Sequence, residues 1–326
     1  MALKDLIRKV KATADKVGEP DSIVQTLDTH LLRAARAPKF DPDWHDKDVF
    51  HPSEVSSGLC PRFKALAHLS KPESKGGAGA SLLGGKDYPD PRLMRIFNMG
   101  HGVHWMYQHK VLGPAGLLWG KWVPGETALM DALVMGKMPE PVIGFMPGPD
   151  WTYVEPAMWN EEYNIGGHCD GIIVLEDGST ALVEVKSIND RGFGFLQEPK
   201  VTHARQLQLY LSGVPTNLTV DGTFNPGWPK EIQKPTGGWN IYVNKNTSVE
   251  KHYWSNTNPE VLAGLYARID EYREALAKEE LPVRIPECKT PRSERAKRCQ
   301  GVSACWELGA GRQGWVEASG VRGCDE

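Results

Sequence analysis

An aspartate, a glutamate and a lysine lie close together in the sequence and have the side chains that metal-dependent hydrolysis requires. Asp170 precedes the turn-forming run Glu176-Asp177-Gly178, and the triplet Glu184-Val185-Lys186 follows it. Two carboxylates can bind a hard divalent cation such as Mg²⁺ or Mn²⁺, which lowers the pKa of a coordinated water. The lysine can orient that water or stabilise negative charge on a phosphate. These residue types therefore indicate hydrolysis of a phosphodiester bond.

The hairpin that carries these residues has a loop whose length can be inferred. Residues 167–187 are predicted to form a strand, a tight turn and a second strand. Gly178 suits the left-handed position of a three-residue loop, and such a loop closes on Leu175 and Ser179. An acid-x-lysine triplet alone is also typical of a solvated strand face, so the pairing across this hairpin decides between the two interpretations.

Counting outward from the closing pair places Asp170 opposite Glu184. Directly paired residues share one face of a sheet, and strand side chains alternate between faces, so Lys186 lies on that face too. A two-residue loop would place Asp170 opposite Val185 instead. With the three-residue loop, the two carboxylates and the amine are expected to converge.

A histidine on an upstream helix is a candidate nitrogen ligand. The helix is predicted from about Pro91 to Val111, and Gly100 and His104 lie one turn apart on one face of it. A nitrogen ligand would favour Mn²⁺ more than an all-oxygen site does. His101 and His109 are the competing candidates, and a helical histidine also commonly serves packing.

A second helix, predicted from Lys200 to Gly213, follows the hairpin. Gln206 and Tyr210 are four residues apart and project together. The glutamine could bind a phosphate or a ligand water, and the tyrosine could stack on a base or form a hydrogen bond with a neighbouring site residue.

The order of these motifs resembles the RecB-like branch of the PD-(D/E)xK nuclease superfamily, over roughly residues 53 to 306. The motifs that carry the resemblance are Gly100-x3-His104, Gly167-His168-Cys169-Asp170, Glu184-Val185-Lys186 and Gln206-x3-Tyr210. The resemblance implies that metal is bound by His104, Asp170, Glu184 and the main-chain carbonyl of Val185. It also implies that Lys186 is catalytic and that Gln206 and Tyr210 support it.

The cysteines add to this resemblance. The N-terminal residues have no apolar signal core, so the chain is expected to be cytoplasmic and free of disulfides. One cysteine precedes the nuclease core and three follow it, namely Cys60, Cys288, Cys299 and Cys305. This layout resembles iron-sulfur nucleases, including CRISPR-associated RecB-like exonucleases, the AddB nuclease domain and related phage exonucleases, and it implies a 4Fe-4S cluster held by four thiolates.

The cysteine spacing departs from the family at one point. Cys299-x5-Cys305 fits the family, but Cys288-x10-Cys299 is longer than the usual two-residue gap, which leaves Cys324 as an alternative fourth ligand. A four-thiolate zinc site and unligated buried thiols are the other interpretations. Cys169 is expected to point away from Asp170 into the core.

The overall charge does not indicate a generally basic nucleic-acid binder. The chain has 326 residues and a formal net charge of −3. It has no apolar run of membrane length, so a membrane partner is not expected. Charge can still be local. Five basic residues lie between the C-terminal cysteines: Lys289, Arg292, Arg295, Lys297 and Arg298. They could form a rim that contacts phosphates, or they could be a solvated loop.

The expected fold class is α/β, with a restriction-endonuclease-like core in which helices flank a central mixed sheet. Four parts are expected along the chain: an N-terminal helical segment (1–45), a Cys60 arm and flexible linker (46–90), the nuclease core (91–280) and a cysteine cluster lobe (281–326). Within the core, strands are predicted at Trp239–Asn244 and Ser248–Trp254 and a helix at Pro259–Lys278.

The function implied by the resemblance is that of a Mg²⁺- or Mn²⁺-dependent DNA exonuclease. It would act on single strands or duplex ends in recombination or repair. The alternatives are a catalytically inactive nucleic-acid-binding module of the same fold and a zinc-stabilised interaction protein. Metal-dependent release of nucleotides would distinguish the first alternative, and visible absorbance would distinguish the second.

Overall fold

The computed structural model describes residues 49–69, 91–126, 129–130, 139–216, 234–299 and 301–319. The chain divides into two units, Met1–Pro42 with Lys86–His101 and Asp43–Gly85 with Gly102–Glu326. The site described below lies in the second unit. The predicted N-terminal helical segment (1–45), the predicted linker at 70–90, residues 217–233 and the residues around Cys324 lie outside the described residues.

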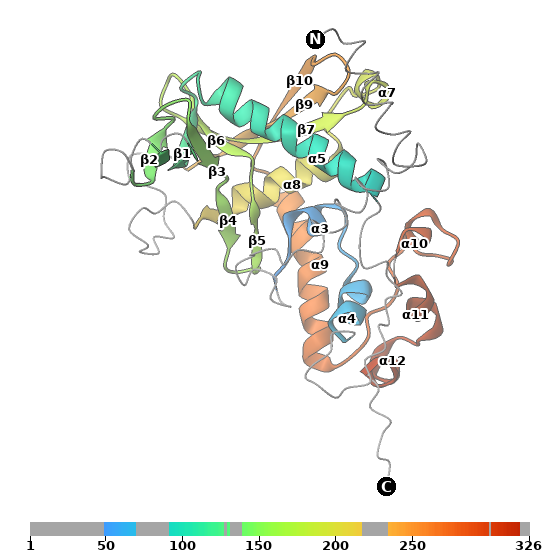
Figure 1. The fold of residues 1–326 in the computed structure, drawn as a ribbon. Coiled ribbons are helices and arrows are strands. Elements are labelled where there is room, and N and C mark those ends of the chain that lie inside the picture. Colours follow the sequence, from blue (N-terminus) through green and yellow to red (C-terminus); the bar gives the residue numbers. More distant parts are fainter. Residues whose placement is uncertain are drawn as a thin grey trace, which may run out of the picture. The chain divides into compact units, whose positions relative to one another are not determined.

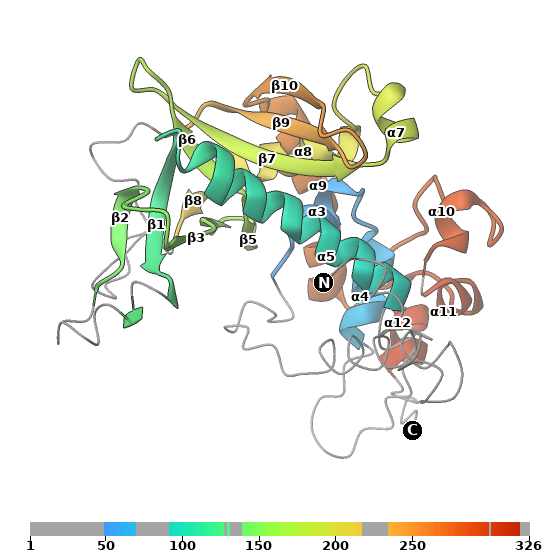
Figure 2. The same ribbon diagram turned by 45° about the horizontal axis from the view of Figure 1, so that its top comes forward.

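A seven-stranded mixed sheet forms the centre of the second unit (Figure 1). Its path is β10-β9-β7-β6-β1-β2, and β3 also pairs with β1. The strands are β1 (Leu118–Pro124), β2 (Val142–Phe145), β3 (Trp151–Val154), β6 (Gly171–Val174), β7 (Thr180–Ile188), β9 (Gly237–Asn244) and β10 (Glu250–Asn256). Only the β7 and β9 pairing is parallel, and β7 lies between β9 and β6 (Figure 2).

Three shorter strands form a separate antiparallel sheet. They are β4 (Ala157–Asn160), β5 (Ile165–His168) and β8 (Val214–Pro215), in the order β5-β4-β8. The segment predicted as one strand from Gly167 is therefore two strands, because the chain leaves β5 of the small sheet, passes through Cys169 and Asp170, and enters β6 of the large one. The break occurs because the main-chain N–H of Cys169 donates to Pro156 instead of continuing the ladder with β7.

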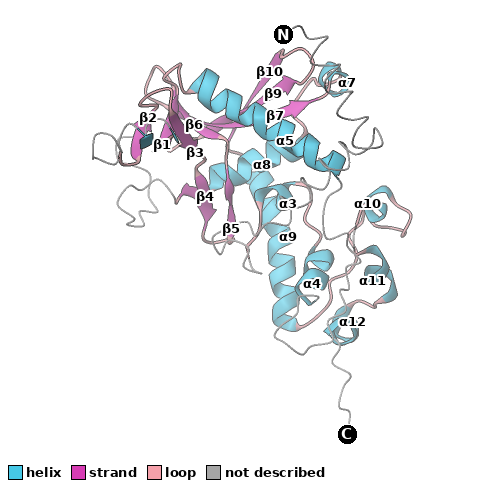
Figure 3. Cartoon of the chain, in the orientation of Figure 1, coloured by secondary structure: helices cyan, strands magenta, loops and turns pink. Residues whose placement is uncertain are grey.

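The helices agree closely with the sequence-based predictions where these can be compared (Figure 3). Helix α8 spans Val201–Ser212 and α9 spans Pro259–Lys278, whereas α5 (Pro91–Met106) continues into a π-helix, η1 (Tyr107–Leu112). The remaining helices are α3 (Pro52–Ser56), α4 (Pro61–Leu69), α7 (Asp190–Gly194), α10 (Glu294–Lys297), α11 (Val302–Glu307) and α12 (Gly311–Ser319). No helix among the described residues is long and apolar enough to cross a membrane.

Apolar side chains cover both faces of the central hairpin, which explains the nearly continuous apolar run of β7. Ile172 and Leu182 pack with Leu207 and Leu211 of α8 on one face. On the other face, alternate residues of β6 and β7 pack with η1; this second cluster includes Ile173, Ala181, Val183, Val185, Tyr107 and Leu112. A strand buried on both faces needs apolar residues at most positions, so a charged residue within it must have a special environment.

The register of the hairpin is the one predicted from its loop. The N–H of Leu175 donates to the carbonyl of Ser179 at 2.8 Å, and Gly178 adopts a left-handed φ of 80°. The ladder then pairs Val174 with Thr180 and Gly171 with Val183. One further step outward places Asp170 opposite Glu184. The loop length alone therefore brought the two carboxylates to one edge of the sheet.

Candidate metal centre

Asp170 directly precedes β6, at the point where the pairing of β6 with β7 stops and β7 continues. The ladder between β6 and β7 does not extend to Val185. The N–H of Val185 therefore donates to a side chain, Oδ2 of Asp170, at 2.6 Å. In an antiparallel pair the N–H and C=O of one strand residue point to the same neighbour. The carbonyl of Val185 therefore faces the same edge as Asp170, which is the direction that a main-chain metal ligand would require.

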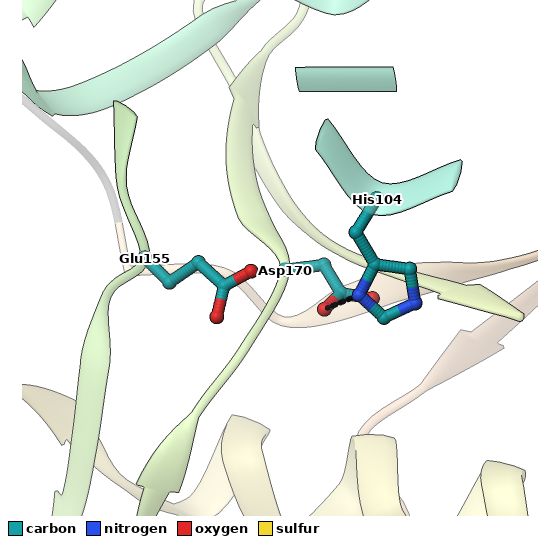
Figure 4. A group of neighbouring side chains, drawn as sticks. All are labelled: His104, Glu155 and Asp170. Atoms are coloured by element: carbon teal, nitrogen blue, oxygen red, sulfur yellow. Dashed lines mark ion pairs between the residues drawn. The ribbon is translucent and has the colours of Figure 1, made fainter. Parts of the chain in front are cut away.

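His104 and Glu155 meet Asp170 at this edge. Nδ1 of His104 lies 3.1 Å from Oδ1 of Asp170, and one donor atom from each of the three residues lies within 4.8 Å of the others. The histidine comes from α5, the glutamate directly follows β3, and the aspartate directly precedes β6. Figure 4 shows the three side chains converging from these separate segments.

The sequence-based prediction did not include Glu155. It lies 15 positions before Asp170, on a segment that reaches the site only because β3 and β6 both pair with β1. Gln108 holds it in place, because Nε2 of Gln108 donates to Oε1 of Glu155 and to the carbonyl of Asp170, both at 2.9 Å. The signal available in the sequence was the position of Gln108, which follows His104 by four residues and therefore could be expected near the site.

Glu184 and Lys186 form an ion pair on the same edge. Nζ of Lys186 contacts Oε1 of Glu184, whereas Oε2 of Glu184 is buried with no hydrogen-bond partner among the described residues. The side chain of Glu184 is only 2% exposed. Burial, followed by the neighbouring charge of Asp170, raises the pKa of Glu184. A buried carboxylate oxygen without a donor is costly, and a bound cation would satisfy it.

The electrostatics of the whole group also favour an added positive charge. Burial raises the pKa of Glu155, and the charge of Asp170 raises it further. Burial lowers the pKa of His104, but the hydrogen bond that its ring donates to Asp170 and the charges of Asp170 and Glu184 outweigh this effect, so its pKa is raised. Three carboxylates thus share one lysine and one histidine. Oxygen and nitrogen donors in this number suit Mg²⁺ or Mn²⁺.

Gln206 and Tyr210 lie on α8, where Nε2 of Gln206 donates to the hydroxyl of Tyr210 at 3.1 Å. Tyr210 is 4% exposed and belongs to the apolar cluster between α8 and the sheet. Its ring is therefore buried against the sheet and is not accessible to a nucleic-acid base. This corrects the stacking role considered from the sequence. The hydrogen bond to a neighbouring residue, the other expectation, is present.

His109, one of the competing histidines, binds main-chain groups and does not contact Asp170 among the hydrogen bonds of the described residues. Its Nδ1 lies 3.0 Å from the carbonyl of Trp105, and its Nε2 accepts from the N–H of Tyr153 at 2.9 Å. Burial lowers the pKa of His109. Both ring nitrogens are thus engaged by the main chain, which leaves His104 as the histidine that reaches the carboxylates.

The four cysteines predicted to bind a cluster all lie in the second unit and are free thiols. Cys60, Cys288 and Cys299 line a cavity of about 680 Å³. Burial raises the pKa of Cys60 to about 11, and the charges of the other three thiols raise it too, so all four are near enough to interact electrostatically. Cys169 is fully buried in the apolar core, as predicted.

These thiols do not form a compact group. Among the described residues, His104, Glu155 and Asp170 are the group in which three donor atoms lie within 4.8 Å of one another. A tetrahedral zinc site with Zn–S bonds of about 2.3 Å needs sulfurs about 3.8 Å apart. As they are placed, no three of these four sulfurs lie close enough together to bind one zinc ion without movement of the side chains.

Arginines surround this cysteine region. Arg62 is 1% exposed, and its Nε donates to Sγ of Cys305 at 3.3 Å. Its other nitrogens donate to the carbonyls of Pro282, Cys305, Leu308 and Gly309. Arg295, one of the five residues predicted as a phosphate rim, donates instead to the carbonyls of Ser57 and Gly58.

Comparisons with known proteins add little. No protein-family model matches the chain, and no curated protein matches it. A solved structure of a protein named SSO0001 superposes with a TM-score of 0.36 and 14% identity, over 77% of this chain and 85% of that chain. An alkaline exonuclease from Laribacter hongkongensis, LHK-Exo, superposes with a TM-score of 0.32 and 10% identity, over 73% of this chain and 94% of that chain. Likenesses of this size carry no weight for the site or its chemistry.

Proposed function

We propose that this protein is a Mg²⁺- or Mn²⁺-dependent deoxyribonuclease. The observation that carries the proposal is the buried edge at which His104 contacts Asp170 and at which one oxygen of the nearby Glu184 has no hydrogen-bond partner among the described residues. Phosphodiester hydrolysis needs a nucleophilic water and neutralisation of the phosphate, and a divalent cation bound here would supply both.

The residues that would hold the cation are His104, Asp170, Glu184 and the main-chain carbonyl of Val185. Asp170 already has one oxygen fixed by the N–H of Val185 and the other beside His104. This arrangement limits the rotation of the carboxylate, so the free lone pairs point to one place. Glu184 contributes the buried oxygen that has no hydrogen-bond donor.

Lys186 is the residue proposed to act on the reacting phosphate. Burial lowers its pKa, but the charges of Glu184 and Asp170 outweigh this effect and raise it, so the amine stays protonated. A protonated amine at this edge can orient a water or stabilise negative charge that develops on the phosphate. Gln206, whose amide is fixed by Tyr210, would support the phosphate or the water from α8.

The proposed substrate is DNA, cleaved from single strands or duplex ends in recombination or repair. The test is to incubate the full-length protein with end-labelled single- and double-stranded DNA in the presence of Mg²⁺, Mn²⁺ or EDTA. Metal-dependent release of nucleotides from the ends supports an exonuclease. Binding of DNA without cleavage in any metal would instead indicate an inactive binding module of the same fold.

We further propose that Cys60, Cys288, Cys299 and Cys305 bind a 4Fe-4S cluster. The proposal is supported by the mutual electrostatic influence of the four thiols and by the cavity between three of them. Because the pKa of Cys60 is raised to about 11, its proton must be displaced when a metal binds. Anaerobically purified protein with about four irons and broad visible absorption would support this assignment.

A further inference from the structure

We propose that Glu155 is an additional carboxylate ligand of the divalent cation and that Gln108 is its positioning residue. The inference rests on the proposed metal dependence of the site. It adds a ligand that neither the motif order nor the hairpin register indicates, because Glu155 lies on a different strand connection from Asp170 and Glu184.

The distances suit coordination to one ion. One donor atom each from His104, Glu155 and Asp170 lies within 4.8 Å of the others. Two ligand atoms bound to one Mg²⁺ at about 2.1 Å lie at most about 4.2 Å apart, and the longer ligand distances of Ca²⁺ allow a slightly larger separation. Small side-chain rotations would therefore bring all three donors onto a common ion without moving the strands.

Gln108 shows that Glu155 is held in place at the site. The amide nitrogen of Gln108 donates to two acceptors at the site, Oε1 of Glu155 and the carbonyl of Asp170. Gln108 is itself buried on η1. The amide therefore fixes the Glu155 carboxylate relative to the Asp170 main chain, while it supplies no positive charge to offset two neighbouring acids.

A second observation points to a missing cation at the same edge. Oε2 of Glu184 is buried without a donor among the described residues, and the charge of Glu184 acts on His104. Lys186, the nearby amine, already contacts the other oxygen of Glu184. His104 and Lys186 both act electrostatically on Glu155, and Lys186 is already paired with Glu184, so an ion between Glu155 and Asp170 would help to balance their charge.

The experiment is a calorimetric titration of the full-length protein with MnCl₂ in the absence of DNA. Glu155→Gln keeps the size and the hydrogen-bonding capacity of the side chain but removes its charge. Glu161→Gln, at an exposed position six residues away, is the matched control. We expect Glu155→Gln to weaken Mn²⁺ binding by about 10-fold or more, and Gln108→Ala to weaken it by about 10-fold, as for supporting residues of metal sites.

Thermal unfolding separates a ligand from a structural carboxylate. Without metal, we expect Glu155→Gln to unfold at or above the wild-type temperature, because one of two neighbouring acids has become neutral. With Mn²⁺ present, its unfolding temperature should rise less than that of the wild type, because a weaker ligand stabilises the native state less. Glu155→Asp, which keeps the charge but shortens the side chain, should bind with intermediate affinity.

The inference is overturned if Glu155→Gln binds Mn²⁺ as tightly as Glu161→Gln while Asp170→Ala has lost binding. In that result the proposed function still stands, because the cation is held without Glu155. If the wild-type protein binds no Mn²⁺ at all, both the inference and the proposed metal dependence are wrong.

Discussion

The carboxylate site and the cysteine region are organised by different parts of the main chain. Asp170, Glu184 and Lys186 lie on or beside strands of one sheet, where the ladder sets the direction of each side chain. The three C-terminal cysteines of the described chain lie on loops and on α11, among helices of four to nine residues. The first site is rigid through its ladder, whereas the second depends on side-chain contacts.

The two regions also differ in how charge is satisfied. The carboxylate site has more acids than bases, and one buried oxygen of Glu184 has no donor within the part of the chain that the structure describes. In the cysteine region, Arg62, Arg284 and Arg295 donate to main-chain carbonyls. Arg62 joins residues more than 200 positions apart in the chain. The first region thus has an excess of negative charge that a cation would offset, whereas the second is held together by arginine contacts within the protein.

The largest effect is expected from Lys186→Ala. The variant should lose cleavage by about 10²-fold or more, because a group that stabilises charge in the transition state is gone. Binding of DNA should persist, and circular dichroism should show an intact fold. A folded variant with near-normal activity would remove Lys186 from the catalytic machinery.

Asp170→Ala and His104→Ala should weaken Mn²⁺ binding, with Asp170→Ala the more severe because Asp170 also binds the N–H of Val185. Excess metal should partly restore activity in these variants, since a weakened ligand set can still fill at high concentration. No excess of metal should rescue Lys186→Ala. Titration with Mn²⁺ would show the difference, and unchanged affinity in both ligand variants would contradict their role.

The cysteine variants test whether a cluster is present in the second region. Cys60→Ala, Cys299→Ala and Cys305→Ala should each remove visible colour and iron from anaerobically purified protein, and should lower its stability. Cys169→Ala is the control, because this thiol is buried in the core and should not affect colour.

The fourth cluster ligand can be identified in the same way. Cys288→Ser should remove the colour, whereas Cys324→Ser should keep it, if Cys288 is the ligand. The opposite result would assign Cys324. Stoichiometric zinc without iron would contradict the cluster and would leave the carboxylate site unaffected, because the two regions share no residues.

Arg62→Met should destabilise the protein by about 3 kcal/mol or more, because buried carbonyls lose their donor. Arg284 also donates to the carbonyls of Cys305 and Leu308, so the acceptors most affected are those of Pro282 and Gly309. Arg292→Met, at an exposed position, should change stability by less than about 0.5 kcal/mol. Denaturant unfolding measures both, and equal effects would show that Arg62 does not join the two ends of this region.

The smallest effect concerns His203, which lies beside the carboxylate site. Burial, followed by the charges of Lys186 and Lys200, lowers the pKa of His203 to about 4. Between its unfolded pKa of about 6.5 and this value, the unfolded chain binds a proton that the native chain does not, so stability falls as the pH decreases. From pH 7 to 5.5 this contribution is about 1 kcal/mol. His203→Gln should lack it, and an unchanged pH slope in denaturant unfolding would contradict the buried neutral state.

Much of the fold followed from local patterns in the sequence. The loop at 176–178 determined the register of β6 and β7, because hairpin geometry depends on loop length and on one left-handed glycine. Helix α9 begins and ends at the predicted residues, since Asn258 caps its first turn and Pro259 starts it. Local spacing could therefore place Asp170, Glu184 and Lys186 on one edge.

Other features depended on contacts between distant segments. Glu155 reaches Asp170 only through the pairing of β3 and β6 with β1, and no spacing in the sequence specifies that pairing. The single predicted strand divided into β5 and β6 because the N–H of Cys169 found its acceptor in a different sheet. Arg62 likewise contacts Cys305 across more than 200 positions of the chain.

The sequence by itself determined the longer helices and the local register of the hairpin, because both arise from interactions between residues a few positions apart. The tertiary structure decided which carboxylates lie close to His104 and how far apart the thiols lie. These distances depend on strand order and on hydrogen bonds between residues remote in the chain, such as that from Gln108 to Glu155.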